Sequence, residues 1–124
     1  MHQAAVTSRK ELGKQGENVA AEFLARHGYQ IVERNVPFKE GEIDIIAEKD
    51  GELCFIEVKT RRTQAFGVEE SVSPRKLRRL RLAAARWLEG RPWAEVRFDV
   101  IGVLVAEGMP PQVRHTRGID RGAR

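Results

Sequence analysis

Three charged residues interrupt two apolar stretches near the middle of the chain: Asp44 in the segment GEIDIIA, and Glu57 and Lys59 in the segment FIEVKT. Two carboxylates held close together away from bulk water repel each other, and a bound cation relieves that repulsion. Magnesium prefers oxygen ligands and is commonly held by one or two carboxylates together with a substrate phosphate. A neighbouring lysine would offset the negative charge that develops on the phosphate. The pattern therefore predicts a Mg²⁺ or Mn²⁺ site at Asp44 and Glu57 that, with Lys59, cuts nucleic acid.

A β-hairpin is predicted to bring these residues together. Residues 42–49 and 52–60 have the composition of strands, and the Asp50-Gly51 pair between them is a strong signal for a two-residue turn. Such a turn makes the two strands antiparallel neighbours. Asp44 and Glu57 are then expected to converge.

Alternation along the strands predicts which side chains share a face. Glu57 and Lys59, two positions apart, project from the same face of their strand. In the preceding strand, Asp44 is expected to share a face with Glu42 and Ile46. Glu42 would serve equally well as a supporting acid or as a solvent-facing residue, so we leave it outside the predicted ligand set.

The rest of the chain is predicted to build an α/β fold around this hairpin. The further elements expected are helices at residues 12–26 and 74–89 and strands at residues 29–36, 95–105 and shortly after Met109. The second helix follows Ser73-Pro74, which has the form of an N-cap and a proline at the first helical position. This order predicts a mixed central β-sheet flanked by helices. We expect a single domain over residues 1–124, with its core at about 12–116 and a basic, flexible tail at about 117–124.

The charge balance favours a polyanionic partner. The formal net charge is +4 and the pI is about 9.6, and 16 of the 22 cationic residues are arginine, whose planar fork suits phosphate oxygens. Genomic base composition can also enrich arginine. The cations whose position suits nucleic acid follow the E-x-K triplet or lie on the second predicted helix: Arg61, Arg62, Arg75, Lys76, Arg78 and Arg79. Each of them taken singly is explained equally well by a solvated amphipathic face.

Several classes of protein are disfavoured by composition. No apolar run approaches the roughly 20 residues of a membrane-spanning helix, which predicts no membrane role. The first ten residues lack the apolar core of a secretory signal, so a cytoplasmic protein is expected. Cys54 is the single cysteine, which excludes an internal disulfide, and no Cys/His cluster suggests zinc.

Residues 13–105 contain a series of motifs in a specific order: GKQGENVAAEFLARHGYQIVERN, GEIDIIA, EVKTRR, FG, SVSPRKLRRLRLAA and RFDVIGV. The first acid, the twelve-residue spacer and the acid-x-lysine triplet resemble the motif of the PD-(D/E)xK nuclease superfamily. Together the segments resemble the YraN family of small bacterial proteins, which are considered similar to archaeal Holliday-junction resolvases. The superfamily's name places a proline before the first acid, whereas Ile43 precedes Asp44 here. That proline is often absent in relatives, so its loss weakens the resemblance little.

The resemblance implies a restriction-endonuclease-like core and a metal-dependent endonuclease that acts on DNA, with branched DNA as the implied preference. It places an additional acid at Glu17, and the helical wheel puts Glu17 at the edge of the apolar face of its helix. The main-chain carbonyl of Val58 is expected to join Asp44, Glu57 and Glu17 at the metal, because alternation turns this oxygen toward the strand edge. The matching helix of resolvase-like folds carries a basic residue near the site, here Lys76, and such relatives form homodimers.

Other interpretations stay open. An E-x-K triplet alone is usually a solvated charge pair, and Glu17 alone could be an exposed first-turn glutamate favoured by the helix dipole. The chain could be a catalytically weak or inactive nucleic-acid-binding module of the same fold, or a regulatory protein whose partner is another protein. A degenerate site would be expected to lose some motif residues, so their presence favours an enzyme. Asp99 in RFDV either supports the site or pairs structurally near Arg97.

Overall fold

The computed structural model describes residues 8–62 and 72–120. Its elements are α1 (Arg9–Arg26), β1 (Gln30–Phe38), β2 (Gly41–Lys49), β3 (Glu52–Arg61), α2 (Pro74–Leu88), β4 (Glu95–Leu104) and β5 (Gln112–Thr116). Each helix and strand predicted from the sequence is present, including the short strand after Met109. The Phe66-Gly67 pair, which contributed to the family resemblance, lies outside the described residues.

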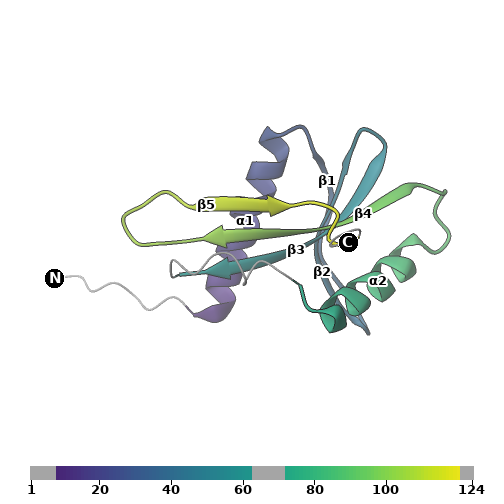
Figure 1. Ribbon diagram of the computed structural model, residues 1–124, viewed down its shortest axis with the longest axis horizontal. Coiled ribbons are helices and arrows are strands. Elements are labelled where there is room, and N and C mark those ends of the chain that lie inside the picture. Colours follow the sequence, from purple (N-terminus) through teal and green to yellow (C-terminus); the bar gives the residue numbers. More distant parts are fainter. Residues whose placement is uncertain (1–7, 63–71, 121–124) are drawn as a thin grey trace.

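The five strands form one mixed sheet in the order β1-β2-β3-β4-β5 (Figure 1). Neighbouring strands are antiparallel except β3 and β4, which are parallel and are joined through α2, as a crossover between parallel strands requires. Asp50 and Gly51 both have positive φ, 52° and 80°, which suits the two-residue turn between β2 and β3. The predicted hairpin and the α/β fold with a mixed central sheet flanked by helices are therefore confirmed.

Local capping signals begin both helices. The Ser8 hydroxyl accepts a hydrogen bond from the Glu11 N–H at 3.0 Å, and the Glu11 carboxylate accepts one from the Ser8 N–H at 3.1 Å. This reciprocal capping box starts α1 at Arg9, earlier than the predicted residue 12. At α2, Ser73 accepts a hydrogen bond from the Lys76 N–H at 3.2 Å and is followed by proline, as predicted.

One helix covers each face of the sheet (Figure 1). The α1-side core comprises Ala20, Leu24, Tyr29, Ile45, Ala47, Cys54, Ile56, Ile101 and Val103. The α2-side core comprises Val36, Ile43, Ile46, Phe55, Leu80, Ala83, Ala84, Trp87 and Phe98. Adjacent residues of β3 belong to opposite cores, Phe55 to the α2 side and Ile56 to the α1 side. Each large side chain buried in this way contributes about 1.5–3 kcal/mol to folding.

The alternation of side chains is interrupted in β2 near Asp44. Ile43 and Ile46, three positions apart, both pack in the α2-side core, whereas Ile45 packs in the α1-side core. Strict alternation would place Ile43 and Ile46 on opposite faces, so the alternation that was used to assign a shared face to Asp44 and Ile46 does not hold across this segment. Asn35 in the neighbouring strand has a φ of 54°, and local irregularities of this kind re-aim side chains in a sheet.

Asp99 pairs structurally with its surroundings. Its side chain is 0% exposed, and its carboxylate accepts hydrogen bonds from Arg97 at 2.9 Å, from His115 Nε2 at 2.8 Å and from the Gly118 N–H at 3.0 Å. Arg97 also donates to the Tyr29 hydroxyl at 2.7 Å. Burial alone would raise the pKa of Asp99, but the hydrogen bonds from His115, Arg97 and Gly118 outweigh it and hold the pKa below its ordinary value.

The chain remains in contact with the sheet beyond β5. Besides the Gly118 hydrogen bond, the Ile119 N–H donates to the Phe98 carbonyl at 2.8 Å, and the Ile119 side chain packs against the α2-side core. These contacts anchor residues that lie within the flexible tail predicted from Arg117 onward. The sequence did not indicate the contacts, because one isoleucine in a polar segment gives no periodic signal. Residues 121–124 lie outside the described residues.

Replacing Asp99 by asparagine is expected to lower the free energy of unfolding by about 3 kcal/mol, because the partly buried Arg97 guanidinium loses its nearer charged partner and keeps the carboxylate of Glu52, at 3.3 Å. Since the folded-state pKa of Asp99 is lowered, this stabilisation is present above the ordinary pKa and is lost as the pH falls through the folded-state value. Urea unfolding of Asp99→Asn measures the effect, with Glu95→Gln, an exposed charge on the same strand, as the matched control. A loss below about 1 kcal/mol would show that the other partners of Arg97 suffice.

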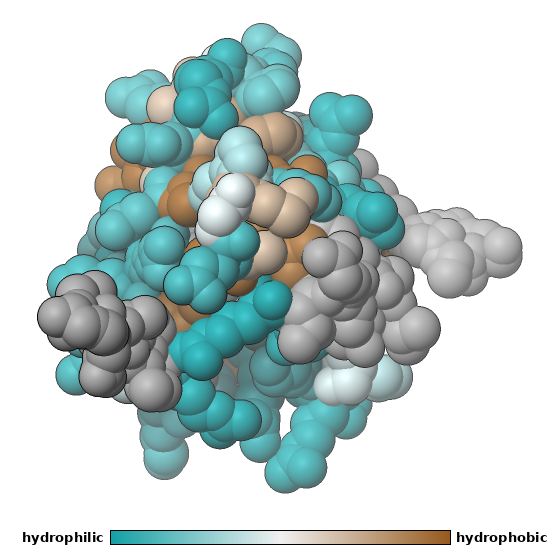
Figure 2. Space-filling view, turned by 90° about the vertical axis from the view of Figure 1, so that its left-hand side faces the viewer, coloured by the Kyte–Doolittle hydropathy of each residue, from teal (hydrophilic) through white to brown (hydrophobic). Residues whose placement is uncertain are grey.

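Hydrophilic side chains dominate the face shown in Figure 2, where they surround a limited area of apolar ones. The large apolar side chains exposed among the described residues are Val32, Leu82, Trp93 and Met109. Neither of the two described helices has the length and apolar character needed to cross a membrane.

Candidate metal centre

The strands β2 and β3 are paired over only part of their length. Their ladder runs from Ile45 opposite Ile56 to Lys49 opposite Glu52. Beyond Ile45 and Ile56, β2 stays paired with β1, whereas β3 continues beside β4 to its end. The two strands therefore separate, as Figure 1 shows, and the gap between them opens just past the last ladder pair.

Three carboxylates meet beside this gap. Glu17 of α1 and Glu42 and Asp44 of β2 each offer a ligand oxygen, and these oxygens all lie within 4.8 Å of one another. Carboxylates this close repel one another unless they take up a proton or a cation. Oxygen donors without sulfur or imidazole suit a hard cation such as Mg²⁺ or Mn²⁺. We call Glu17, Glu42 and Asp44 the acid cluster.

Asp44 is held in the gap by the main chain of the facing strand. Its Oδ2 accepts a hydrogen bond from the Val58 N–H at 2.8 Å. Burial, together with the nearby charges of Glu57, Glu17 and Glu42, raises the pKa of Asp44 to about 7 despite this hydrogen bond. A carboxylate with so perturbed a pKa in a cleft is typical of a functional site.

Glu17 is partly balanced by Arg34 of β1. Arg34 Nη2 lies 3.5 Å from Glu17 Oε1 and donates a hydrogen bond to the Asn18 side chain at 2.7 Å. Burial raises the pKa of Glu17, the charge of Arg34 lowers it, and the charge of Glu42 raises it, so that the pKa lies above its ordinary value. The Glu17 carboxylate lies within 4.8 Å of that of Asp44, and Glu17 is the residue that the resemblance implied as an additional acid.

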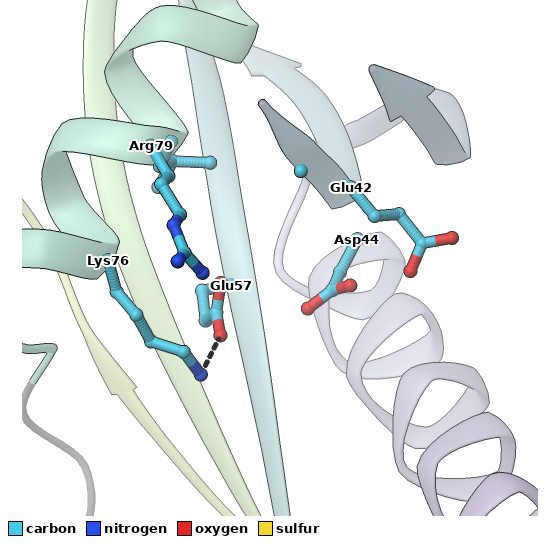
Figure 3. Close-up of a pocket in the computed structure, with 7 residues that line it drawn as sticks. Glu42, Asp44, Glu57, Lys76 and Arg79 are labelled. Carbon is cyan, nitrogen blue, oxygen red and sulfur yellow. Dashed lines mark hydrogen bonds and ion pairs between the residues drawn. The ribbon is translucent and has the colours of Figure 1, made fainter. Parts of the chain in front are cut away.

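Glu57 lines a hollow on the α2 side of the gap, which we call the α2-side hollow. This hollow has a volume of about 240 Å³ and is lined by Gly41, Glu42, Asp44, Glu57, Lys76, Arg79 and Leu80. Glu57 Oε2 lies 3.2 Å from Lys76 Nζ, and Figure 3 shows Glu57 turned toward Lys76 with Glu42 and Asp44 across the hollow. Asp44 and Glu57 thus share a hollow, although the Glu57 carboxylate is not one of the three acids in the cluster.

A second hollow, which we call the α1-side hollow, lies on the other side of the acid cluster. Its volume is about 480 Å³, and it is lined by Arg9, Lys10, Gly13, Lys14, Glu17, Asn35, Glu42, Asp44 and Val58. Glu42 and Asp44 line both hollows. The acids therefore stand between cations of α1 on one side and cations of α2 on the other.

Three predicted residues of β3 and its extension lie outside both hollows. Lys59 follows Glu57 by two positions, which places it on the same strand face, and it is partly buried. Arg61 is the last residue of β3, and Arg62 follows it. None of the three is among the described residues that line the two hollows.

The predicted cations of α2 divide into two groups. Lys76 and Arg79, three positions apart and hence on one side of the helix, line the α2-side hollow (Figure 3). Arg75 and Arg78 are exposed and are not among the described residues of either hollow. Arg79 and Lys76 therefore line the same hollow, whereas Arg75 and Arg78 lie outside it.

Sequence reasoning missed four residues beside the gap. Glu42 was left outside the ligand set, although its spacing of two from Asp44 already placed both acids on one strand face. Arg9, Lys10 and Lys14 were not considered at all. No local signal marks them, because their position beside the acids depends on where α1 packs on the sheet.

Close packing of α1 on β3 sets the position of Glu17. Gly16 is buried against Thr60, and a Cβ at position 16 would lie 2.8 Å from the Thr60 Cβ and nearer still to its hydroxyl. A Cβ at Gly13, one turn earlier, would meet nothing within 4 Å. Glycine at position 16 therefore permits the approach that carries Glu17 to the acid cluster.

Gly16→Ala is expected to lower the free energy of unfolding by about 1–3 kcal/mol, because α1 must move away from β3 and carries Glu17 with it. Gly13→Ala is the matched control and is expected to raise stability by about 0.5–1 kcal/mol, since alanine is the better helix former. Thermal unfolding of both variants, with and without Mn²⁺, measures these changes. Equal stabilities of the two variants would show that the contact with Thr60 does not hold the helix in place.

The fold and the site define a small α/β protein with an acid cluster where two strands of a mixed sheet separate. The family model described as Uncharacterised protein family UPF0102 matches residues 16–103, and this chain belongs to that family. A UPF0102 protein of Corynebacterium efficiens is 49% identical over 95% of this chain and 98% of its own length. A UPF0102 protein of Corynebacterium diphtheriae is 45% identical over 87% of this chain and 89% of its own. A UPF0102 protein of Syntrophomonas wolfei is 46% identical over 80% of this chain and 89% of its own length. The resemblance to the YraN family, at the level of this family, is thereby confirmed.

Proposed function

We propose that this protein is a metal-dependent endonuclease of the PD-(D/E)xK superfamily, with a restriction-endonuclease-like core. The observation that supports this most directly is the acid cluster at the gap between β2 and β3, with Glu57 lining the same hollow as Asp44. The hairpin presents Asp44 on one strand and the E-x-K triplet on the other, which is the arrangement that the motif implies. The family match covers each of these acids.

The acids of the gap suit Mg²⁺ or Mn²⁺. Asp44, with Glu17 and Glu42, supplies the nearest group of oxygens, and Glu57 is the further carboxylate in the same hollow. The Val58 carbonyl is an additional candidate, because the N–H and C=O of one residue in an extended strand point to the same side, and its N–H already faces Asp44. When bound, the cation would lower the pKa of a water molecule and neutralise charge on the scissile phosphate.

The cations of the α2-side hollow would hold the phosphate. The Lys76 ammonium, 3.2 Å from Glu57, would exchange this ion pair for one with a phosphate oxygen and so release the Glu57 carboxylate for the site. The Arg79 guanidinium would contribute a planar fork that suits two phosphate oxygens. Lys59, on the same strand face as Glu57, would offset the charge that develops during cleavage.

DNA is the proposed substrate, and branched DNA is the preferred form that the resemblance implies. Arg61 and Arg62, at the end of β3, and Arg75 and Arg78, exposed on α2, would contact backbone phosphates outside the hollows. A homodimer, again by resemblance, would present two such sites to one branched substrate.

A cleavage panel tests the proposal. Duplex, flap, four-way junction and single-stranded DNA, and RNA, are incubated with Mg²⁺, Mn²⁺ or a chelator. Product is expected only with metal, and the Glu57→Gln protein, purified in the same way, identifies any contaminating nuclease. Salt-sensitive binding without cleavage of any substrate would indicate an inactive binding module instead. If neither binding nor cleavage is found, the nucleic-acid function is wrong and a protein partner becomes the better hypothesis.

A further inference from the structure

We propose that one polynucleotide strand occupies both hollows and crosses the acid cluster between them, so that Arg9, Lys10 and Lys14 of α1 contact its phosphates. The proposal rests on the nuclease function proposed above and extends the binding surface to a second rim. We call Arg9, Lys10 and Lys14 the α1 rim, and Lys76 and Arg79 the α2 rim.

The continuity of the two hollows carries this inference. Glu42 and Asp44 line both of them, so the two hollows adjoin at these side chains. The α1 rim lines only the α1-side hollow, and the α2 rim lines only the α2-side hollow. Along this path the charges run from positive, through the acid cluster, to positive again.

A polynucleotide strand complements this charge order better than a single small anion does. An isolated phosphate bound in one hollow would contact the rim of that hollow and leave the other rim without a phosphate, and the acids would repel it from the centre. A strand places phosphates at both rims at once, while a divalent cation at the acid cluster offsets the repulsion of the phosphate between them. Two basic rims flanking a metal site are therefore expected to bind the strand on both sides of the bond that is cut.

The α1 rim is available for this contact. Arg9, Lys10 and Lys14 are exposed, and they occupy the first turns of α1, at the positive end of the helix dipole. Within the described residues, the ion pair of Glu17 is made by Arg34 of β1, outside this rim. The rim cations thus lie beside the acids and face the space that a substrate would enter.

The test compares two double variants of equal charge. Lys10→Gln with Lys14→Gln removes two rim charges, whereas Arg26→Gln with Arg117→Gln removes two exposed charges from the last turn of α1 and from the segment after β5. Both pairs are made in the Glu57→Gln protein, so that a fluorescent oligonucleotide is bound in Mg²⁺ and remains uncut. The rim pair is expected to reduce the slope of log affinity against log salt by about 1.4–1.8, at 0.7–0.9 per lost phosphate contact, and the control pair by less than about 0.5.

Substrate truncation then locates the contact. With Glu57 restored, the rim pair is expected to raise KM for substrates that extend on both sides of the cut, and to have no effect once the nucleotides on one particular side are removed. For the double variant Lys76→Gln with Arg79→Gln, the rise in KM should instead disappear when the nucleotides on the opposite side of the cut are removed. If the two double variants of the α1 test show equal slopes while the unmodified protein cleaves, the second rim is wrong and the nuclease function stands. If the unmodified protein neither binds nor cleaves, both proposals fall. Circular dichroism checks that the exposed substitutions leave the fold intact.

Discussion

Asp44→Asn and Glu57→Gln proteins are expected to lose cleavage by at least about 100-fold while remaining folded, because each substitution removes a carboxylate charge from a site whose groups act as one unit. Lys59→Ala should lose activity to a similar extent, since the lysine offsets charge only when the metal and phosphate are in place. Single-turnover cleavage at saturating Mn²⁺ measures the chemical step separately from binding and product release.

Glu48→Gln is the matched control for these variants, because it removes an exposed carboxylate from the same strand as Asp44. It should cleave as the unmodified protein does. Full cleavage by the Glu57→Gln protein would point to a contaminant or to a different site.

Glu42→Gln decides between two ligand sets. A loss equal to that of Asp44→Asn would make Glu42 a ligand, as the acid cluster indicates. Activity near that of the unmodified protein would return the site to Asp44, Glu57, Glu17 and the Val58 carbonyl, the set predicted from the sequence.

In the absence of metal, Asp44→Asn is expected to stabilise the protein. Burial and three neighbouring carboxylates raise the pKa of Asp44 from 3.8 to about 7, so the folded state holds this proton more tightly than the unfolded chain does. At pH 8 the ionised Asp44 therefore destabilises the fold, by up to about 4 kcal/mol for a shift of roughly three pKa units. Asparagine removes the charge and can still accept the Val58 hydrogen bond. A site that lowers stability in this way is typical of function.

The pH dependence gives the sign of this effect. Between about pH 4 and pH 7 the folded protein binds more protons at Asp44 than the unfolded chain, so this residue makes the free energy of unfolding fall as the pH rises. Below pH 4 the penalty is absent, and above pH 7 it is complete. Asp44→Asn should therefore gain most at pH 8 and little at pH 4, as thermal unfolding at the two pH values would measure.

Metal should reverse which of the two proteins, unmodified or Asp44→Asn, has the higher melting temperature. Mg²⁺ or Mn²⁺ in excess is expected to raise the melting temperature of the unmodified protein, because a ligand that binds only the folded state stabilises it, and to raise that of Asp44→Asn much less. Asp50→Asn removes the same charge from the exposed turn, where asparagine tolerates the positive φ. It should change neither the stability without metal nor the rise in melting temperature with metal. If Asp44→Asn is stabilised but the unmodified protein does not respond to metal, the repulsion at Asp44 would be supported and the metal site would be wrong.

Much of the fold was predictable because its signals are local. Asp50-Gly51 specifies a tight turn, Ser73-Pro74 specifies a helix start, and the apolar periods of 2 and 3.6 distinguish the strands from the helices between them. The early start of α1 was also encoded locally, in the capping box of Ser8 and Glu11, which was overlooked. The contact of Ile119 with the core had no comparable signal.

The candidate site was predictable in three of its acids but not in its full membership or its arrangement. Strand spacing singled out Asp44 and Glu57, and the family resemblance added Glu17. The clustering of Glu42 with two of them depends on β2 and β3 separating after Ile45, and on α1 approaching β3 at Gly16. Neither event is visible in a strand pattern that assumes continuous pairing and strict alternation.

The sequence by itself determined which helices and strands form and which acids stand at the ends of the hairpin, because caps, turns and periodicity act between residues close along the chain. Only the tertiary structure decided that Glu57 pairs with Lys76, that Asp99 pairs with His115, and that two basic rims flank one acid cluster. Most of these contacts join elements that are distant in the chain. Their distances depend on how the helices pack on a twisted sheet, which no local pattern specifies.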